Sequence, residues 1–437
     1  MKWKAVKIMP KISPRTMIII LAVVLLLSAP IFIGMMIPSF AYLLGTVGMP
    51  AFSGVQQFVG GLNKFNTLCV PFFTLASTIM GRGEIGPRLV KFSRSMVGHL
   101  PGGSALTTIL CCVIIGAISG AAYSGIFIIG ALMYEELKRN GYDDGFSTGL
   151  IITSSPIGML IPPSIMFVVF AMNTDTSILK LFLSGTVSGL IMAIMYGIYS
   201  VWYAKKHNLK PTPKATGREL WQATKDAKWA LGLPIVMIGG MYSGIFSPTE
   251  AAGASAIYAI AVEMLVYKGM RFKELFKIVV EAAKTSASIY LLLGAGQLLG
   301  YTMTLAKLPQ AFEQLVNFSS PAMVLIMINI IFLIAGCFIN GSSALVVLVP
   351  LVMTLARRAG IDMVHLGNIL VVNLSIGMYT PPFGLCLFVG SKTLNVSFSK
   401  CVKGVLPFMV ISLIVLAIIT AFPILSTGLP DLLYPAY

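Results

Sequence analysis

The sequence predicts an all-α integral membrane protein with many spans, organised as two inverted repeats that each hold a re-entrant hairpin and a broken helix. Composition, the placement of basic residues and an internal repeat predict this class. Of the 437 residues, 57% are hydrophobic and only 11% are charged. Soluble domains have about 25% charged residues. The chain therefore cannot cover a water-facing surface, which excludes soluble enzymes, nucleic-acid-binding proteins and disordered chains despite a net charge of +16.

The N-terminal region predicts an uncleaved first span. Basic residues precede an apolar stretch that begins at Met17 and continues through Ile31 to Ile37, without a clear signal-peptidase site. We expect a cytoplasmic N-terminus. At about 20 apolar residues per crossing, the whole chain has room for roughly a dozen spans within the lipid bilayer.

The densest basic stretch fixes the expected topology. Seven lysines and arginines lie between residues 204 and 229, beside only Glu219 and Asp226. Short basic loops favour the cytoplasm, so this loop is predicted to lie inside. The span 177–203 then leads back to an outer turn at 173–176. On the other side, spans are expected at 229–245, 251–267 and 285–305, with a second outer turn at 247–250.

An internal repeat appears when the segment 137–163 is aligned without gaps with the segment 356–382. LKRNGYD (137–143) lies over ARRAGID (356–362), and IGMLIPP (157–163) lies over IGMYTPP (376–382). Five spans separate the two units, so their orientations must be opposite. Inverted repeats are typical of secondary transporters, whose binding site lies between the repeats near the membrane midplane. Arg357 and Arg358 would then lie outside, against the positive-inside tendency.

Each repeat also contains a predicted re-entrant hairpin. The apolar segments 104–116 and 126–137 are short for a full crossing and flank a tip of small residues at 118–125. In the second repeat, segments 322–335 and 344–356 flank the tip 336–343. Non-helical backbone at membrane depth is tolerated where it lines a cavity. Small residues also drive ordinary helix packing, which remains the alternative for each tip.

The Pro-Pro sequences predict broken helices suited to binding an anion. Pro162 and Pro163, and likewise Pro381 and Pro382, are expected to begin a second half-helix, because proline is favoured in the first turn. Thr380 is a candidate N-cap. The freed N–H groups suit a carboxylate, and the opposed carbonyls suit Na⁺. The alternative is that each Pro-Pro merely kinks an ordinary span.

Several residues have a structural alternative to a functional role. The six cysteines lack metal or disulfide spacing and are read as core residues. The motif GAISG at 116–120 lacks the spacing of a nucleophilic serine, and no enzyme is expected. Glu263 lies inside a predicted span, where an acidic residue usually has a function, but it is close enough to the inner basic cluster to extend toward the interface.

Motifs throughout the chain resemble the large membrane subunit of TRAP transporters. In the first half these are PFFTLA (71–76), GHLPGG (98–103), ISG (118–120), IPPSI (161–165) and LFLSG (181–185). SPTEAA (247–252), GN (367–368) and YTPPFG (379–384) resemble the second half. The resemblance implies an elevator-type, Na⁺-driven importer of organic acid anions in a bacterial inner membrane. It also implies a small four-helix membrane subunit and a periplasmic substrate-binding protein as partners.

Two acidic residues of the family pattern are missing. Gly125 stands where an Asp usually follows the first tip, and FIN at 338–340 replaces the usual FMD. The first tip also reads GAA at 120–122, so one serine hydroxyl is absent. Neutral oxygens would then hold Na⁺. A stand-alone ion-coupled anion symporter without a binding protein remains the alternative, and a channel-like or scaffold protein is a further one.

These observations define the predicted segments. The N-terminal scaffold spans cover residues 1–97, and the first repeat of the transport domain covers 98–176. Further scaffold spans, with the basic loop at 204–228, cover 177–306. The second repeat of the transport domain covers 307–392, and the C-terminal span covers 393–437. Substrate contacts are predicted at Ser119, Gly120, Pro162, Pro163, Ser164, Thr380, Pro381 and Pro382. Na⁺ is the predicted coupling ion, without a prosthetic group, and its predicted ligands are Ser119, Ser124, Gly158, Asn340, Gly341, Ser342 and Gly377.

Overall fold

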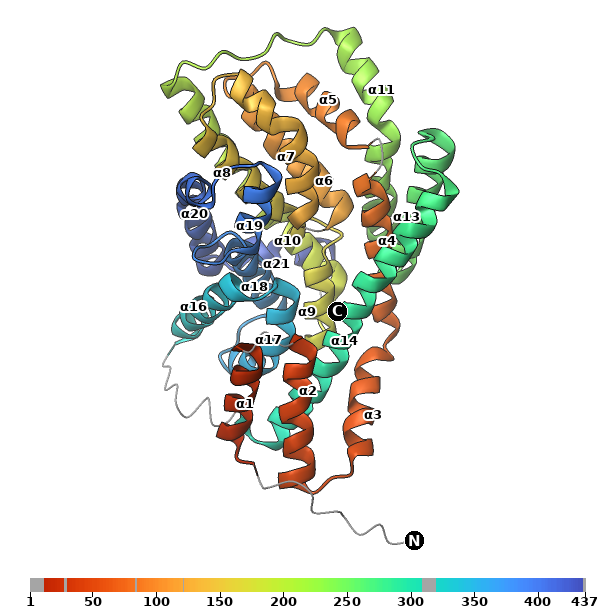
Figure 1. Cartoon of the computed structure of the whole chain (residues 1–437), viewed down its shortest axis with the longest axis vertical. Coiled ribbons are helices and arrows are strands. Elements are labelled where there is room, and N and C mark those ends of the chain that lie inside the picture. Colours follow the sequence, from red (N-terminus) through yellow and green to blue (C-terminus); the bar gives the residue numbers. More distant parts are fainter. Residues whose placement is uncertain (1–11, 27–29, 83–84, 121, 309–319, 435–437) are drawn as a thin grey trace.

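The chain is described by a computed structural model that covers residues 12–26, 30–82, 85–120, 122–308 and 320–434 (Figure 1). These residues form helices joined by short connections, with no strand in the described ranges. Six of the described helices are long and apolar enough to cross a membrane: Ile178–Lys206, Pro248–Val266, Phe272–Leu305, Pro321–Phe338, Gly341–Arg358 and Phe398–Ala421.

The N-terminal third begins with two helices where the sequence predicted one span. Helix α1 (Pro14–Leu26) packs against α2 (Ile31–Tyr42), and the prediction of a single span through Ile37 is wrong because Pro30 starts a new helix. The remaining elements are a π-helical turn (Leu43–Val47), α3 (Ala51–Leu62), a 3₁₀ turn (Phe65–Leu68), α4 (Cys69–Arg82) and α5 (Ile85–Val97).

The first repeat contains the predicted hairpin and broken helix. Helices α6 (Gly103–Ser119) and α7 (Ala122–Arg139) form the hairpin. The broken helix comprises α8 (Asp144–Ser154), a 3₁₀ turn (Ser155–Met159) and α9 (Ile165–Thr174). Asp143 caps α8 by accepting from the Phe146 N–H at 2.8 Å.

The middle of the chain differs from the prediction in its basic segment. The elements are α10 (Ile178–Lys206), α11 (Gly217–Pro234), a π turn (Ile235–Gly239), α12 (Gly240–Tyr242), α13 (Pro248–Ala261), a π turn (Val262–Val266) and α14 (Phe272–Leu305). The predicted loop at 204–228 is therefore partly helical. Thr216 and Glu219 form a capping box that starts α11 before the apolar run begins.

The second repeat follows the same order as the first. Helices α16 (Pro321–Phe338) and α17 (Gly341–Arg358) form the hairpin, α18 (Met363–Gly377) and α19 (Leu385–Thr393) form the broken helix, and α20 (Phe398–Ala421) and α21 (Ile424–Leu433) complete the chain. Helix α20 follows the second broken helix as α10 follows the first. Figure 1 shows the first hairpin in the upper half of the molecule and the second in the lower half.

The two charged loops of the repeat lie at opposite ends of the broken helix. The loop after α7 leads into α8, where Lys138 pairs with Asp144 at 3.3 Å. The loop after α17 lies beside the far end of α9, because Arg357 donates to the carbonyl oxygen of Thr174 at 3.2 Å. The repeats therefore have opposite orientation, as predicted. A cation at helix C-terminal carbonyls is favourable, which explains a basic residue on the side opposite the basic loop.

A second cation reaches the same end of α9 from the N-terminal region. Lys64, between α3 and α4, donates to the carbonyl oxygen of Met172 at 3.1 Å and lies 3.5 Å from the Asp175 carboxylate. The Asp175 side chain is 88% exposed. This contact joins residues on either side of the predicted boundary at 97.

The hairpin helices are longer than predicted. The four helices contain 17 or 18 residues each, about 26 Å of rise, so length alone does not stop them at mid-depth. The first helix of each hairpin packs against the broken helix of its own repeat, α6 against α8 and α16 against α18. The second helix of each hairpin also packs against the broken helix of the other repeat, α7 against α19 and α17 against α9. The tips consequently meet at the breaks.

Burial bears on two further expectations, those for the cysteines and for Glu263. All six cysteines are free and buried, which confirms their reading as core residues. Glu263 is fully buried on the π turn after α13, so the alternative that it extends to the interface is wrong. Tyr267, one turn later, accepts from the Ala230 N–H and lies under the Arg88 guanidinium, which connects α5, α11 and the end of α13.

Candidate functional site at the hairpin tips

The tip of the first hairpin contacts the interruption of the first broken helix, residues 157–164, which we call the first break; residues 376–383 form the second break. Gly120 ends α6 with φ +59°, and a β-carbon there would lie 2.0 Å from the carbonyl oxygen of Pro163. One turn earlier, a β-carbon on Gly116 would lie 2.1 Å from Cα of Gly158. Real β-carbons do not approach that closely, so only glycine permits this packing. The glycines place the tip backbone directly beside the broken backbone.

The second repeat has the same arrangement. A β-carbon on Gly377 would lie 2.6 Å from Cα of Gly336, so this hairpin also meets its own broken helix through two glycines. Next to this contact, the rings of Phe338 and Phe383 lie 5.1 Å apart between centroids. Both phenylalanines are about half exposed, whereas the first break (157–164) is buried, as are Gly120 and Gly125 of the first tip.

The two tips also contact each other. The Tyr123 hydroxyl, at the start of α7, lies near the side chain of Asn340, which precedes α17. The Asn340 Oδ1 accepts from the Ser342 N–H at 3.0 Å and caps α17. A β-carbon on Gly341 would lie 2.7 Å from the end of the Met166 side chain in α9. The starts of α7, α9 and α17 are therefore neighbours.

The electrostatics of this region come from the backbone. The tips 118–125 and 336–343 and the breaks 157–164 and 376–383 contain no Asp, Glu, His, Lys or Arg. The starts of α7, α9 and α17 meet here, and α19 packs against α7. Each helix start carries a positive partial charge and unpaired N–H groups. The ends of α6, α16 and α18 lie here as well and present carbonyl groups with negative partial charge, so the region offers ligands for an anion and for a cation without any charged side chain.

The structure places the predicted substrate residues unequally. Pro162, Pro163 and Ser164 are buried with Gly120, whereas Pro382 is exposed and Thr380 and Pro381 are half-buried. The Pro-Pro peptide bonds of both breaks are cis. Ser119 ends α6, but its side chain and that of Ser124 lie outside the described residues.

Two predicted helix starts are wrong. Helices α9 and α19 begin after their Pro-Pro pairs, at Ile165 and Leu385, because the prolines lie in the connecting stretch. Thr380 does not cap α19, since its hydroxyl donates to the Ile376 carbonyl at 2.8 Å and Gly384 occupies the N-cap. Ser164 is the N-cap of α9 and accepts from the Phe167 N–H at 3.4 Å.

Two of the predicted Na⁺ ligands, Gly158 and Gly377, belong to the glycine contacts. Gly158 and Gly377 belong to the breaks, and Asn340, Gly341 and Ser342 form the start of α17. The Gly377 carbonyl accepts from the Thr380 N–H at 3.1 Å, which leaves its second lone pair. Asn340 is exposed and Ser342 is half-buried, so neither side chain is fully enclosed by the protein.

Sequence reasoning missed a buried hydroxyl triad that holds the second break. The hydroxyl groups of Tyr196 in α10, Tyr379 at the break and Ser412 in α20 lie 2.6–3.1 Å from one another. All three side chains are almost completely buried. The positions that the repeat pairs with these three hold Val415, Leu160 and Ala193, so the repeat gave no signal for the triad.

Sequence comparisons identify the relatives of this chain. The family described as tripartite ATP-independent periplasmic transporter, DctM component, matches residues 18–425. The C4-dicarboxylate TRAP transporter large permease protein DctM of Pseudomonas aeruginosa is 35% identical, covering 84% of this chain and 86% of that protein. The ectoine TRAP transporter large permease protein TeaC of Halomonas elongata is 34% identical, with 87% and 90% covered. The sialic acid TRAP transporter large permease protein SiaM of Vibrio cholerae is 34% identical, with 92% and 95% covered.

A solved structure supports the fold. The Alcanivorax borkumensis YdaH transporter matches with a TM-score of 0.56 and 13% identity, covering 86% of this chain and 88% of that one. At that identity the likeness shows the fold alone. The family match extends through both hairpins and both breaks, and the family is one of transporter permeases and not of enzymes. This chain is a multi-pass membrane protein that belongs to the DctM-component family of the TRAP transporters.

Proposed function

We propose that this chain is the large transmembrane subunit of a tripartite, Na⁺-driven importer of an organic acid anion. The observation that carries the proposal is the gathering of helix starts in a region without charged side chains. A carboxylate there would accept hydrogen bonds from free backbone N–H groups, as anions do at helix N-termini. Relatives are named for C4-dicarboxylate, sialic acid and ectoine, all of which carry a carboxylate group.

The coupling ion is proposed to be Na⁺. A proton-coupled site needs a group that titrates, and the tips and breaks contain no Asp, Glu or His. They offer carbonyl, hydroxyl and amide oxygens, including those of Asn340 and Ser342, which are ligands suited to a hard cation. Without a carboxylate to balance it, bound Na⁺ would be neutralised partly by the anionic substrate. Binding of each should therefore strengthen binding of the other.

The proposed partners are a small four-helix membrane subunit and a periplasmic substrate-binding protein, in a bacterial inner membrane. The family description makes the chain one component of a tripartite system. The proposed movement is an elevator, in which both hairpins and both broken helices move as one body. Their mutual packing through α7 with α19 and α9 with α17 supports a single body.

Reconstitution tests this function. The chain, its small membrane subunit and its binding protein are placed in proteoliposomes, and uptake of succinate, N-acetylneuraminate and ectoine is measured. An imposed Na⁺ gradient at fixed pH should drive concentrative uptake of one of them. Matched vesicles with a pH gradient and no Na⁺ should show none.

Two results would contradict the proposal. Uptake that follows the pH gradient and ignores Na⁺ would overturn the coupling ion. Saturable uptake by this chain alone, with both partners omitted, would favour the stand-alone symporter.

A further inference from the structure

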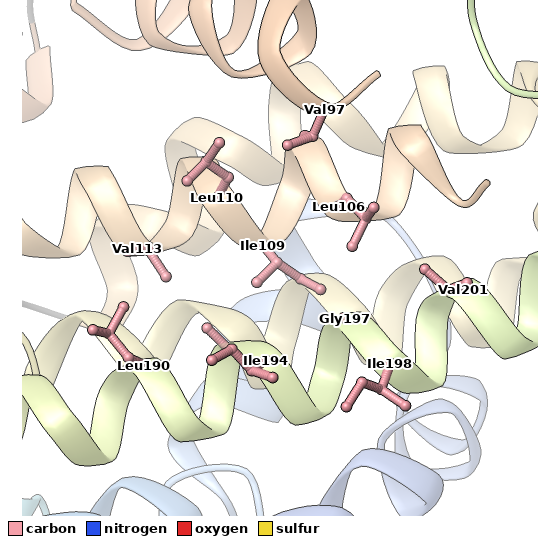
Figure 2. Close-up of a pocket in the computed structure, with 11 residues that line it drawn as sticks. Val97, Leu106, Ile109, Leu110, Val113, Leu190, Ile194, Gly197, Ile198 and Val201 are labelled. Carbon is pink, nitrogen blue, oxygen red and sulfur yellow. The ribbon is translucent and has the colours of Figure 1, made fainter. Parts of the chain in front are cut away.

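An apolar groove lies between the first hairpin and α10, away from the tips (Figure 2). Its volume is about 510 Å³, and every lining residue is apolar. Leu106, Ile109 and Val113 of α6 form one wall, and Leu190, Ile194 and Ile198 of α10 form the other. Gly197 provides the space at its floor, since a β-carbon there would lie 3.3 Å from Leu106.

The groove is confined to the half of α10 that leads to its basic end. Leu190, Ile194, Ile198 and Trp202 are 46–60% exposed and form one stripe, whereas no residue from Ile178 to Gly189 is exposed. The lining runs from Leu190 to Val201, which corresponds to about 16 Å of helix. One leaflet of a bilayer's hydrocarbon core is about 15 Å thick. The groove therefore has the length of one leaflet.

Basic residues surround the open end of the groove. Lys205 and Lys206 follow the lining residue Val201 by one turn, and the Lys206 ammonium lies 4.9 Å from the Trp202 ring. The next loop folds back across this end, because the Thr212 hydroxyl and N–H both donate to the Gly98 carbonyl, at 2.7 and 3.2 Å. The loop brings Lys210 toward the same end. Tryptophan and lysine at this level are typical of the headgroup region.

We propose that the groove binds one anionic phospholipid of the cytoplasmic leaflet, with an acyl chain against α6 and α10 and the headgroup at Lys205 and Lys206. The length, the apolar lining and the charge at one end each match that ligand. A partner's transmembrane helix matches less well. The apolar lining would suit such a helix, but the lysines beyond one end of the groove complement an anionic headgroup and not an apolar helix.

Native mass spectrometry of the purified full chain tests the proposal with phosphatidylglycerol and phosphatidylethanolamine of equal chain length. The wild type should retain one phosphatidylglycerol in preference to phosphatidylethanolamine. Gly197→Leu fills the groove and should abolish that preference. Gly253→Leu is the matched control, because a β-carbon at Gly253 in α13 meets nothing within 4 Å. Equal retention by Gly197→Leu and wild type would overturn the proposal.

The headgroup contact is tested separately. The double variant Lys205→Gln and Lys206→Gln should weaken phosphatidylglycerol retention by roughly 30-fold, the effect of two lysines near an anionic surface. The control pair, Lys273→Gln and Lys277→Gln, lies at the start of α14 and should change retention little. Equal effects of both pairs, or equal retention of the two lipids by wild type, would overturn the headgroup assignment.

A photocrosslink in native membranes identifies the molecule bound in the groove without a substitution that fills it. Benzoylphenylalanine at position 198, in the middle of the exposed stripe, should give an adduct with the added mass of a phospholipid. A protein adduct at this position would assign the groove to a partner helix and overturn the proposal.

Discussion

At the residue scale, variants of Asn340 can distinguish a capping role of this side chain from a role in binding Na⁺. Its Oδ1 caps α17, and its side chain also meets Tyr123 of the other hairpin. Asn340→Leu removes both contacts and the proposed Na⁺ ligand. We expect a large rise in the Na⁺ concentration for half-maximal uptake, with a loss of stability of about 0.5–2 kcal/mol from the missing cap.

Two conservative variants serve as controls for Asn340. Asn340→Ser retains a capping oxygen, so thermal unfolding should resemble wild type while the Na⁺ dependence weakens. Asn340→Asp retains the cap and adds a negative charge, and should lower the Na⁺ concentration for half-maximal uptake. An unchanged Na⁺ dependence in all three variants would leave Asn340 with capping alone.

Another residue-scale prediction concerns the hydroxyl triad. Tyr379→Phe retains the ring but removes two hydrogen bonds, to Tyr196 and Ser412. At about 1 kcal/mol per bond, the apparent melting temperature should fall by a few degrees. Tyr301→Phe is the control, because its hydroxyl makes a weak contact with the Met49 sulfur, at 3.7 Å, and no other hydrogen bond to the described residues. Equal melting temperatures for the two variants would show that the triad adds no stability.

The sequence predicted some residues of the site and missed others for a physical reason. Asn340 and the Pro-Pro pairs were found because they interrupt an apolar run, which is a local signal. Tyr196 and Ser412 were missed because each stands in an ordinary helical stretch and becomes part of the site only through contacts with distant segments. Tyr123 lies in the predicted first tip, but its proximity to Asn340 joins two distant segments and gives no local signal. Thr380 was misjudged because its hydroxyl bonds backward to Ile376.

At the scale of elements, the glycine pairs fix how each hairpin meets its broken helix. A β-carbon on Gly158 would lie 2.4 Å from Cα of Gly116, and backbone cannot yield as a flexible side chain can. Gly158→Ala should therefore separate α6 from the break, destabilise the protein by about 1–3 kcal/mol and reduce uptake. Gly377→Ala should do the same in the second repeat.

Gly253→Ala is the matched control for these variants. It lies within α13 with open space around it, so alanine should leave uptake unchanged and stabilise the helix slightly. Thermal unfolding and uptake of the three variants decide the matter. A Gly158→Ala protein that behaves like Gly253→Ala would show that the close contact is not needed.

Elements were predicted well where an apolar run stops at a local signal. Ser177 and Ser247 begin helices as N-caps close to the predicted starts of their spans. The prediction was wrong for α11, because its first half is charged and is held by the Thr216 capping box and not by an apolar face. The predicted lengths of the hairpin helices were also wrong. Helices α6 and α7 continue through polar or glycine-rich residues at the ends of their apolar runs, where neighbouring helices pack against them.

At the scale of the whole molecule, the inverted repeat makes a topological prediction. Asn140→Cys should react with a membrane-impermeant maleimide only from the cytoplasm, and Ala359→Cys only from the periplasm. The six native cysteines are buried and should give a low background. Lys210→Cys, in the basic loop, reports the cytoplasmic side as a control. Labelling of positions 140 and 359 from one side would contradict the inverted orientation.

The whole-molecule order was largely predictable because the internal repeat and the basic segment are global signals that need no contact information. The split of the first span into α1 and α2 was not predictable from hydropathy, since Pro30 interrupts a run that is apolar on both sides. The mutual packing of α7 with α19 and of α9 with α17 was also hidden, because it joins segments that lie in different halves of the chain.

The contact between Lys64 and the end of α9 is a weak part of the packing between the N-terminal helices and the first broken helix. Its partners are the Met172 carbonyl and an aspartate that is mostly exposed to solvent. Exposed ion pairs of this kind contribute about 0.2–1 kcal/mol, which is comparable to thermal energy, and salt screens them. The ion pair therefore adds little to the cost of separating the N-terminal helices from α9, and it adds less as ionic strength rises.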